Sequence, residues 1–217
     1  MNEHVTTKGI ILKTSNLGEY DKRLVVLSSD FGKITVFARG VRRQGSRHLA
    51  ACSPFTFGEF DLFPSRDAYS LLNLRVENYF EALRTDFDIS CLGMYFLEVA
   101  DYYTRENLDE RQMLSLLYVS LRMLEKIVAK TSSIDPRLVR CAFEMKAIAV
   151  NGEFPGASAV PDLSVGAVNA INHIAATRVE KLFSFNVTPE VLSELEKSAG
   201  IFRGRFLNAD FKSLSML

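Results

Sequence analysis

Residues 54–64, PFTFGEFDLFP, contain the change of pattern that decides the fold. Phe55 and Phe57 share one phase of a two-residue alternation, whereas Phe60 and Leu62 share the opposite phase, and Gly58 lies at the switch. A β-bulge, one extra residue in a strand, produces such a switch and bends the strand. Because a bent strand allows a small sheet to close on itself, this stretch predicts a barrel.

Outward from this stretch, the apolar residues between Val5 and Tyr79 keep a period of two. The pattern predicts five strands, at approximately 6–14, 21–29, 33–41, 54–63 and 69–78. Asp30-Phe31-Gly32 predicts a tight hairpin between the second and third strands, because glycine adopts positive φ without strain.

After Glu81 the apolar period changes to 3.6 residues, which is typical of helices. Four helices are predicted. Apolar stripes indicate two of them, over 89–103 and 114–128. An Asp-Pro start indicates the third, over 135–150, and a Thr-Pro start with a stop at Gly200 indicates the fourth, over 188–200. The sequence therefore predicts an α+β chain with a five-stranded β-barrel over residues 1–80 and an α-helical C-terminal domain over 81–217.

The net charge of zero conceals an asymmetry between these two parts. The 217 residues contain 26 basic and 26 acidic side chains, but residues 1–80 contain 11 basic against 8 acidic ones, and the remainder contains 15 against 18. No acid occurs between Asp30 and Glu59, where five cations cluster: Lys33, Arg39, Arg42, Arg43 and Arg47. A block of this kind is suited to bind polyanions.

The composition excludes several classes of protein. With 47% hydrophobic and 24% charged residues, the chain is neither intrinsically disordered nor collagen-like. The longest uncharged run, residues 163–177, is shorter than the ~20 residues that span a bilayer, so no membrane association is expected. The start lacks a signal-peptide pattern and the three cysteines are odd in number and far apart, which predicts a reduced, cytoplasmic protein.

Motifs for catalysis or cofactor binding do not occur in the sequence. It has no Gly-x-Ser-x-Gly elbow, and no Cys or His pair has zinc spacing. Residues 40–46 have the glycine spacing of a phosphate loop, but Ser46 occupies the position of the essential lysine. We therefore expect no catalytic residue, no metal and no cofactor.

The residues of the third predicted strand favour a nucleic-acid surface. Its apolar residues alternate with an outward-facing ring, Phe37, which Lys33 and Arg39 flank. Single strands bind where aromatic rings stack with bases and cations contact phosphates. The full candidate DNA-binding set is Lys8, Lys13, Lys22, Arg23, Lys33, Phe37, Arg39, Arg42, Arg43 and Arg47. Two alternatives stay open: Phe37 packs beneath the helical domain, or the arginines are merely solvated.

Short motifs are spread along the chain: Lys8-Gly9-Ile10-Ile11-Leu12-Lys13-Thr14, Gly18-Glu19-Tyr20-Asp21-Lys22, Phe31-Gly32-Lys33-Ile34, Ala38-Arg39-Gly40-Val41-Arg42-Arg43, Pro54-Phe55, Leu83-Arg84, Phe143-Glu144-Met145-Lys146 and Lys212-Ser213-Leu214. Together they resemble the bacterial RecO family of recombination mediators, over most of the chain and most strongly in the barrel. The resemblance implies an N-terminal OB-fold, binding of single- and double-stranded DNA, and annealing of complementary strands. It also implies partnership with RecR and with the tail of single-stranded DNA-binding protein, and help in loading RecA.

This chain departs from the family at one point. Many members carry a four-cysteine zinc module soon after the helix that resembles Phe143 to Asn151. Residues 156–163 contain no cysteine, so the module is expected to be absent or degenerate, and we predict no zinc.

The acidic, amphipathic tail of single-stranded DNA-binding protein should need an apolar groove with a cationic rim. The candidate partner-binding residues are Arg122, Lys126, Arg137, Arg140 and Lys146, whose alternative interpretation is as solvated helix faces. The expected function is that of a DNA-repair mediator located in the cytoplasm with the nucleoid. The competing hypothesis is an OB-fold protein-interaction adaptor whose DNA contact is incidental.

Overall fold

The computed structural model describes residues 4–46 and 48–217. The chain divides into two compact units. The barrel unit consists of the described residues up to Glu81 together with Ala100–Leu114, and the helical unit consists of Ala82–Val99 and Ser115–Leu217. The division expected after residue 80 did not include the segment 100–114, which lies far along the sequence from the strands with which it groups.

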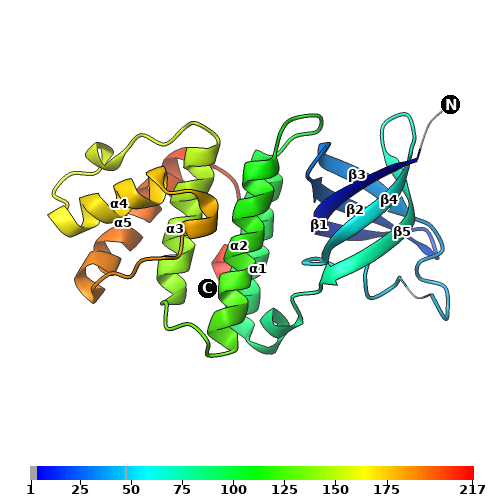
Figure 1. Ribbon diagram of the computed structural model, residues 1–217, viewed down its shortest axis with the longest axis horizontal. Helices are drawn as coiled ribbons and strands as arrows, with labels where there is room; N and C mark the ends of the chain where they lie inside the picture. The colour runs from blue at the N-terminus through cyan, green and yellow to red at the C-terminus, as the bar shows by residue number, and fades with distance from the viewer. Residues whose placement is uncertain (1–3, 47) are drawn as a thin grey trace. The chain divides into compact units, whose positions relative to one another are not determined.

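Five strands form a closed barrel in the order β1-β2-β3-β5-β4 (Figure 1). They are β1 (Val5–Leu17), β2 (Asp21–Ser28), β3 (Gly32–Ala38), β4 (Phe57–Pro64) and β5 (Tyr69–Asn78). β3 pairs with β5 in parallel at Val36–Tyr69 and Phe37–Ser70, and the other neighbouring pairs are antiparallel. The predicted five-stranded barrel of the OB-fold type, followed by helices, is confirmed.

The bulge predicted in the fourth strand at Gly58 was placed in the wrong strand: the irregularity lies opposite Gly58, but the extra residue, Glu77, is in β5, and β4 itself alternates regularly from Phe57 to Leu62. Phe57 lies opposite Asn78 whereas Gly58 lies opposite Val76, so the register shifts by one residue between them. A Cβ at Gly58 would come within 2.3 Å of a β5 carbonyl oxygen, which leaves room only for glycine. The backbones of β4 and β5 therefore approach closely where the barrel bends.

Three predicted strand ends were wrong by three residues: β1 extends to Leu17 instead of residue 14, and positive φ angles explain the other two. β4 begins at Phe57 instead of residue 54, because the φ of Phe55 is 75° and the preceding residues form turns. β3 ends at Ala38 instead of residue 41, because the φ of Gly40 is 64° and a turn follows. The freed residues between Ala38 and Phe57 form a long connection.

This connection contributes to the barrel core. Val41, Ala51 and Cys52 are at most 3% exposed and pack with inward residues of all five strands. Burial raises the pKa of the Cys52 thiol to about 11, so the thiol behaves as a small apolar group. The cations of the connection are thus attached to a segment whose apolar residues are anchored in the core.

The hairpin predicted at Asp30–Gly32 is also confirmed, with a φ of 66° at Gly32. The segment 100–114 packs directly on this hairpin. Lys33 donates its backbone N–H to the carbonyl of Arg105 at 3.0 Å, and Asn107 donates to the carbonyl of Phe31 at 3.0 Å. A Cβ at Gly32 would lie 2.3 Å from the Arg105 carbonyl oxygen. Gly32 is therefore required both for the turn and for this close approach.

Five α-helices follow the barrel: α1 (Phe87–Tyr103), α2 (Arg111–Val128), α3 (Pro136–Val150), α4 (Val165–Ala176) and α5 (Pro189–Phe206). The predicted cap of α3 is confirmed, since the Asp135 side chain accepts from the Arg137 N–H. The stop predicted at Gly200 was wrong, because glycine without positive φ continues a helix and α5 extends for six more residues. α4, which Ser164 caps, was not predicted from the sequence.

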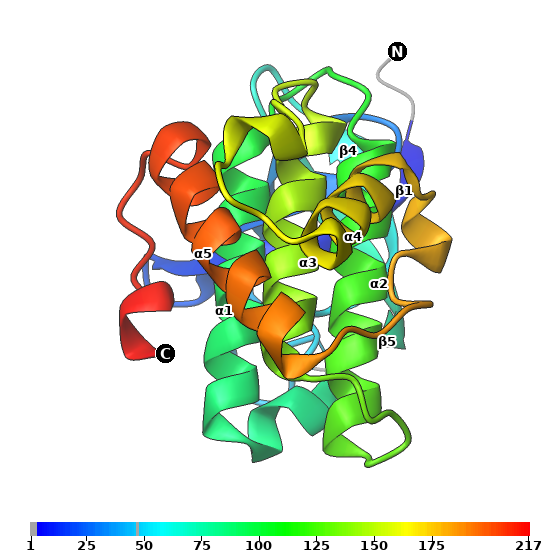
Figure 2. The ribbon, with the colours of Figure 1, turned by 90° about the vertical axis from the view of Figure 1, so that its left-hand side faces the viewer.

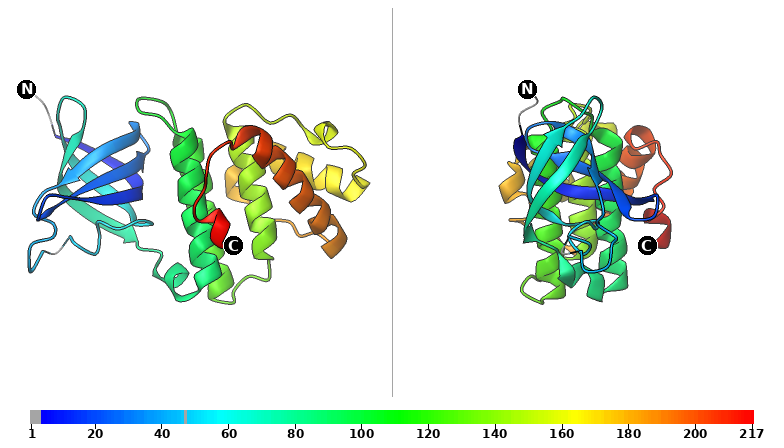
Figure 3. Two further views of the ribbon diagram at one scale, coloured as in Figure 1. Left: turned by 180° about the vertical axis from the view of Figure 1, so that it is seen from behind. Right: turned by 90° about the vertical axis from the view of Figure 1, so that its right-hand side faces the viewer.

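In the helical unit, α3, α4 and α5 pack against one another, as Figure 2 shows. Phe96 of α1 stacks on Phe143 of α3 with ring centroids 4.0 Å apart. The C-terminal segment lies beside α1 (Figure 3), where Phe211 contacts Tyr95 edge-on and Ser213 donates to Glu98. In the described residues, no helix combines the length and the apolarity needed to cross a bilayer.

Substituting Gly32 with alanine should destabilise the protein far more than substituting Gly18. Gly18 also has a positive φ, of 55°, but its Cβ position has no atom within 4 Å. Gly18→Ala should therefore cost only the conformational strain of about 1 kcal/mol, whereas Gly32→Ala should cost about 3 kcal/mol or more because the segment 100–114 must also move. Urea unfolding of the two variants measures the difference, and equal losses would show that this packing is unimportant.

Candidate nucleic-acid interface

The outward residues at one end of the barrel form a row across four strands. Arg23 lies opposite Phe37, Phe37 opposite Ser70, and Ser70 opposite Phe63. Residues directly opposite one another share a face of a sheet, so these four form one surface, the strand face. Phe63 is 45% exposed and Phe37 is partly exposed, which makes both rings accessible to a ligand.

Two turns border the strand face. The β1–β2 turn lies beside the end of β3, because Lys22 pairs with Ala38. The β4–β5 turn lies there too, because Val36 pairs with Tyr69 just after that turn. In OB-folds, oligonucleotides bind over strands 2 and 3 between the corresponding two loops. The strand face therefore has the location at which this architecture binds nucleic acid.

Three arginines of the β3–β4 connection lie at this end. Arg42 bonds the β1–β2 turn twice, from its backbone N–H to the Tyr20 carbonyl at 2.8 Å and from its guanidinium to the Gly18 carbonyl at 3.3 Å. The Arg43 guanidinium lies 5.5 Å from the centroid of the Tyr20 ring. Arg39 is exposed and has no ion-pair partner among the described residues. We call Arg39, Arg42, Arg43 and Tyr20 the arginine turn.

The other candidate cations of the barrel are held by protein groups. Lys8 forms an ion pair with Glu77 at 2.7 Å, and Lys22 donates to the Cys52 carbonyl at 2.8 Å. Lys13 and Lys33 both bond the carboxylate of Asp101, at 2.6 and 3.0 Å. Arg47 lies outside the described residues. Of the ten candidates, the structure brings Arg23, Phe37 and the three arginines of the arginine turn to one end of the barrel.

Phe63 and Tyr20 were not among the candidates predicted from the sequence. Phe63 could have been found, because it follows the inward Phe60 and Leu62 in the alternation of β4 and must face outward. Tyr20 is 44% exposed on a turn, where alternation gives no information, and only the contact with Arg43 distinguishes it.

In the helical unit, the five candidate partner-binding residues are not in one place. Arg137 and Arg140 line a cavity of about 500 Å³, together with Glu196, which both arginines contact, and with Asp86, Asp88 and Asp135. Arg122 and Lys126 line a second cavity of about 360 Å³. Lys146 is only 7% exposed and donates to the last carbonyls of α4, at 2.8 and 2.6 Å. Its amino group caps a helix and is not available to a partner.

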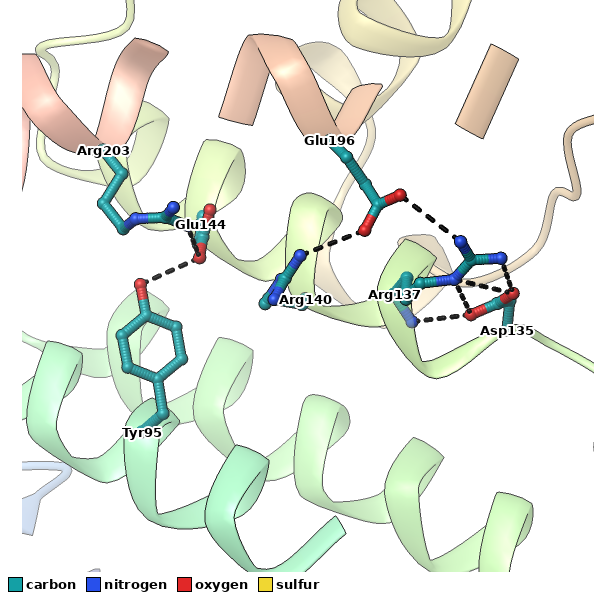
Figure 4. A network of polar contacts seen from close by, with 7 residues as sticks. All are labelled: Tyr95, Asp135, Arg137, Arg140, Glu144, Glu196 and Arg203. Atoms are coloured by element: carbon teal, nitrogen blue, oxygen red, sulfur yellow. Dashed lines mark hydrogen bonds and ion pairs between the residues drawn. The ribbon is translucent and has the colours of Figure 1, made fainter. Parts of the chain in front are cut away.

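A buried polar network lies next to the first cavity (Figure 4). Glu144 is fully buried, and its Oε1 atom accepts from Tyr95 Oη and from Arg203, each at 2.9 Å. Oε2 has no hydrogen-bond partner among the described residues. Burial raises the pKa of Glu144 above its ordinary value of 4.5, because the charged form loses hydration. The network joins α1, α3 and α5.

The raised pKa predicts a pH-dependent difference between the wild type and Glu144→Gln, which keeps an acceptor for Tyr95 and Arg203. The folded wild type binds its proton more tightly than the unfolded chain, so its stability falls as pH rises above 4.5. Relative to Glu144→Gln, the wild type should therefore lose stability between pH 4.5 and 7.5. Urea unfolding at both pH values measures this, with Glu196→Gln as the control for a partly exposed acid. A constant difference would contradict it.

The cysteines and histidines form no metal site in the described part of the chain. Cys52, Cys91 and Cys141 are free and buried, and no group of three or more His, Cys, Asp or Glu side chains there has an arrangement that could hold a metal ion. The absence of zinc stays a prediction.

Comparison with known proteins agrees with this architecture. Residues 1–80 match the family described as "Recombination protein O N terminal". DNA repair protein RecO of Acetivibrio thermocellus is 26% identical, over 99% of this chain and 96% of the relative. DNA repair protein RecO of Caldicellulosiruptor bescii is 36% identical over 69% of this chain, and that of Alkaliphilus metalliredigens is 30% identical over 70%. The chain spans 59% of the length of each of these two relatives. The matched barrel and the matches over most of the chain mean that this protein belongs to the RecO family.

Proposed function

We propose that this protein is a recombination mediator in DNA repair; its relatives are named as DNA repair proteins. In this proposal the barrel binds single- and double-stranded DNA and anneals complementary strands. Together with RecR, the protein helps to load RecA onto DNA that single-stranded DNA-binding protein coats. Exchanging one protein coat for another requires competing binding energies and no bond chemistry, so a mediator needs no catalytic residue. We expect it in the cytoplasm, associated with the nucleoid.

The observation that carries the proposal is the strand face beside the arginine turn. Phe37 and Phe63 offer two aromatic rings, and Arg23 lies in the same row. Bases can stack on the rings irrespective of sequence, while the guanidinium groups contact phosphates. Because the apolar part of the β3–β4 connection is anchored in the core, Arg42 and Arg43 are held near this face before DNA arrives.

Reversing the charges of Arg42 and Arg43 should weaken DNA binding and its salt dependence together. For single strands each lost phosphate contact reduces the slope of log K against log salt by about 0.7, so Arg42→Glu with Arg43→Glu should reduce it by about 1.4 and the affinity by about 10-fold or more. Fluorescence anisotropy of a labelled oligonucleotide across a salt series measures both quantities. The matched control is Lys197→Glu with Lys212→Glu, which changes the net charge equally on exposed residues of the helical unit. Equal effects of the two pairs would contradict a specific surface.

A second substitution distinguishes the contribution of base stacking to DNA affinity from the contribution of charge. Phe63→Ala removes an exposed ring and no charge, so affinity should fall by about 5-fold or more while the salt slope stays constant.

A RecR pull-down with the variant that carries Arg42→Glu and Arg43→Glu distinguishes the mediator from the adaptor. Retained RecR binding with loss of DNA repair supports the mediator, whereas loss of the pull-down supports the adaptor.

Within this proposal, the acidic tail of single-stranded DNA-binding protein fits the second cavity of the helical unit better than the first. The second cavity has an apolar lining of Val119, Met123 and Phe183, and its charged lining comprises three cations, Arg122, Lys126 and Lys181, against one acid, Glu180. The first cavity has two arginines against four acids. Charge complementarity therefore favours the site that contains Arg122 and Lys126, although Glu125 already pairs with Arg122.

Variants in the two cavities should distinguish these sites. Lys126→Glu with Lys181→Glu should reduce the affinity of a labelled acidic tail peptide by about 10-fold, because like charges then face the peptide. Arg137→Glu with Arg140→Glu, which makes the same change in charge at the first cavity, should change it less than 2-fold. A larger loss of affinity in the Arg137 and Arg140 variant would assign the tail to the first cavity. If neither pair of substitutions changed the affinity, both cavities would be excluded as the binding site of the tail.

A further inference from the structure

A pocket of about 360 Å³ lies in the barrel unit, between strands β1 to β3 and the segment 100–114. Its charged lining consists of four cations and two acids: Lys13, Arg23, Lys33, Arg105, Asp101 and Glu106. We call it the lysine pocket. Arg23 belongs both to this pocket and to the strand face, so the two surfaces are continuous.

Asp101 occupies the centre of the positive charge in the lysine pocket. Its Oδ2 atom accepts from Lys13 Nζ at 2.6 Å, and its Oδ1 atom accepts from Lys33 Nζ at 3.0 Å. Although burial alone would raise the pKa of Asp101, the two ammonium groups lower it below its usual value. The carboxylate therefore stays ionised at neutral pH and neutralises the two lysines.

The two oxygens of this carboxylate resemble the two non-bridging oxygens of a phosphodiester in charge and in donor requirement. Lys33, Thr35 and Phe37 project to the same side of β3, and Phe37 is four positions after Lys33, about 13 Å along the strand. A nucleic-acid strand on the strand face therefore has the pocket within reach of its backbone.

We propose that the lysine pocket is a phosphate subsite of the nucleic-acid surface and that Asp101 is a resident anion which competes with the phosphate. The inference rests on the proposed DNA binding and specifies how that site is regulated. Lys33 also donates to the backbone carbonyl of Asp101 at 2.6 Å, so its ammonium group stays in place when the carboxylate leaves. Lys13 is 60% exposed and is free to follow the incoming phosphate.

Removing the resident charge should strengthen DNA binding. Asp101→Asn frees two lysines, so affinity of the full chain for labelled oligo(dT) at low salt should rise about 10-fold and the salt slope should steepen by about 0.7 to 1.4. Asp109→Asn is the matched control, because Asp109 lies in the same segment, pairs with Arg111 and does not line the pocket. It makes the same change in net charge and should alter affinity less than 2-fold.

Lys13→Gln, measured first in the wild type, supplies a test that does not depend on the folding of the Asp101 variant. In the wild type this substitution should change affinity less than 2-fold, because Asp101 already neutralises the lysine. In the Asp101→Asn background it should reverse about half of the gain in salt slope. A wild-type loss as large as that of the Arg42 and Arg43 variant would show that Lys13 binds DNA unopposed, and would overturn the role of Asp101.

The outcomes separate this inference from the proposed function. If the wild type binds DNA and depends on Arg42 and Arg43 while Asp101→Asn matches Asp109→Asn, only the inference fails. If neither the wild type nor Asp101→Asn binds DNA although both give cooperative thermal unfolding, both proposals fail. Stronger binding by Asp101→Asn, with about half of the gain in salt slope reversed on adding Lys13→Gln, supports the subsite.

Discussion

The parallel contact between β3 and β5 is the constraint on which the rest of the barrel unit depends. It comprises two residue pairs, Val36–Tyr69 and Phe37–Ser70, and it closes the sheet. Parallel pairing cannot be made by a hairpin, so the chain must traverse the long β3–β4 connection and β4 before β5 arrives. That detour anchors the arginine turn, and the closure itself brings Phe37 and Phe63 onto one face. Fold and candidate site thus follow from the same contact.

Counter-charges decide which cations of the barrel are available. Between Asp30 and Glu59 the sequence has five cations and no acid, which suggests an unopposed positive block. In the folded barrel unit, Asp101 neutralises Lys33 from more than sixty positions away, and the Asp21 carboxylate accepts from the Gly40 N–H beside Arg39. Counting charges along the sequence overestimates the positive charge of a surface, because acidic side chains from distant segments pack against it. The positive charges of Arg42 and Arg43 are not neutralised in this way, because their contacts among the described residues are with backbone carbonyls of the β1–β2 turn and with the Tyr20 ring instead of with carboxylates.

The helical unit shows the same difference between sequence and space. Arg122, Lys126, Arg137, Arg140 and Lys146 were grouped because all are cations of neighbouring helices. The structure distributes them over two cavities and one helix cap. Helical periodicity gives the face of each residue on its own helix, but which other helix covers that face depends on packing. α4, which caps its own start with Ser164 and is capped at its end by Lys146, was not predicted at all.

Local patterns in the sequence were sufficient to predict the class of the protein: five strands, a hairpin at Gly32, helices capped at Asp135 and Thr188, and the family resemblance. Each of these depends on local periodicity, on glycine conformation or on side chains within a few residues. Which cations are free, the shared face of Phe63 and Phe37, and the position of Asp101 between two lysines of the barrel became clear only from the folded structure. These depend on pairing and packing between segments distant in sequence, and the physical reason is that burial and Coulombic attraction act across space, independently of chain position.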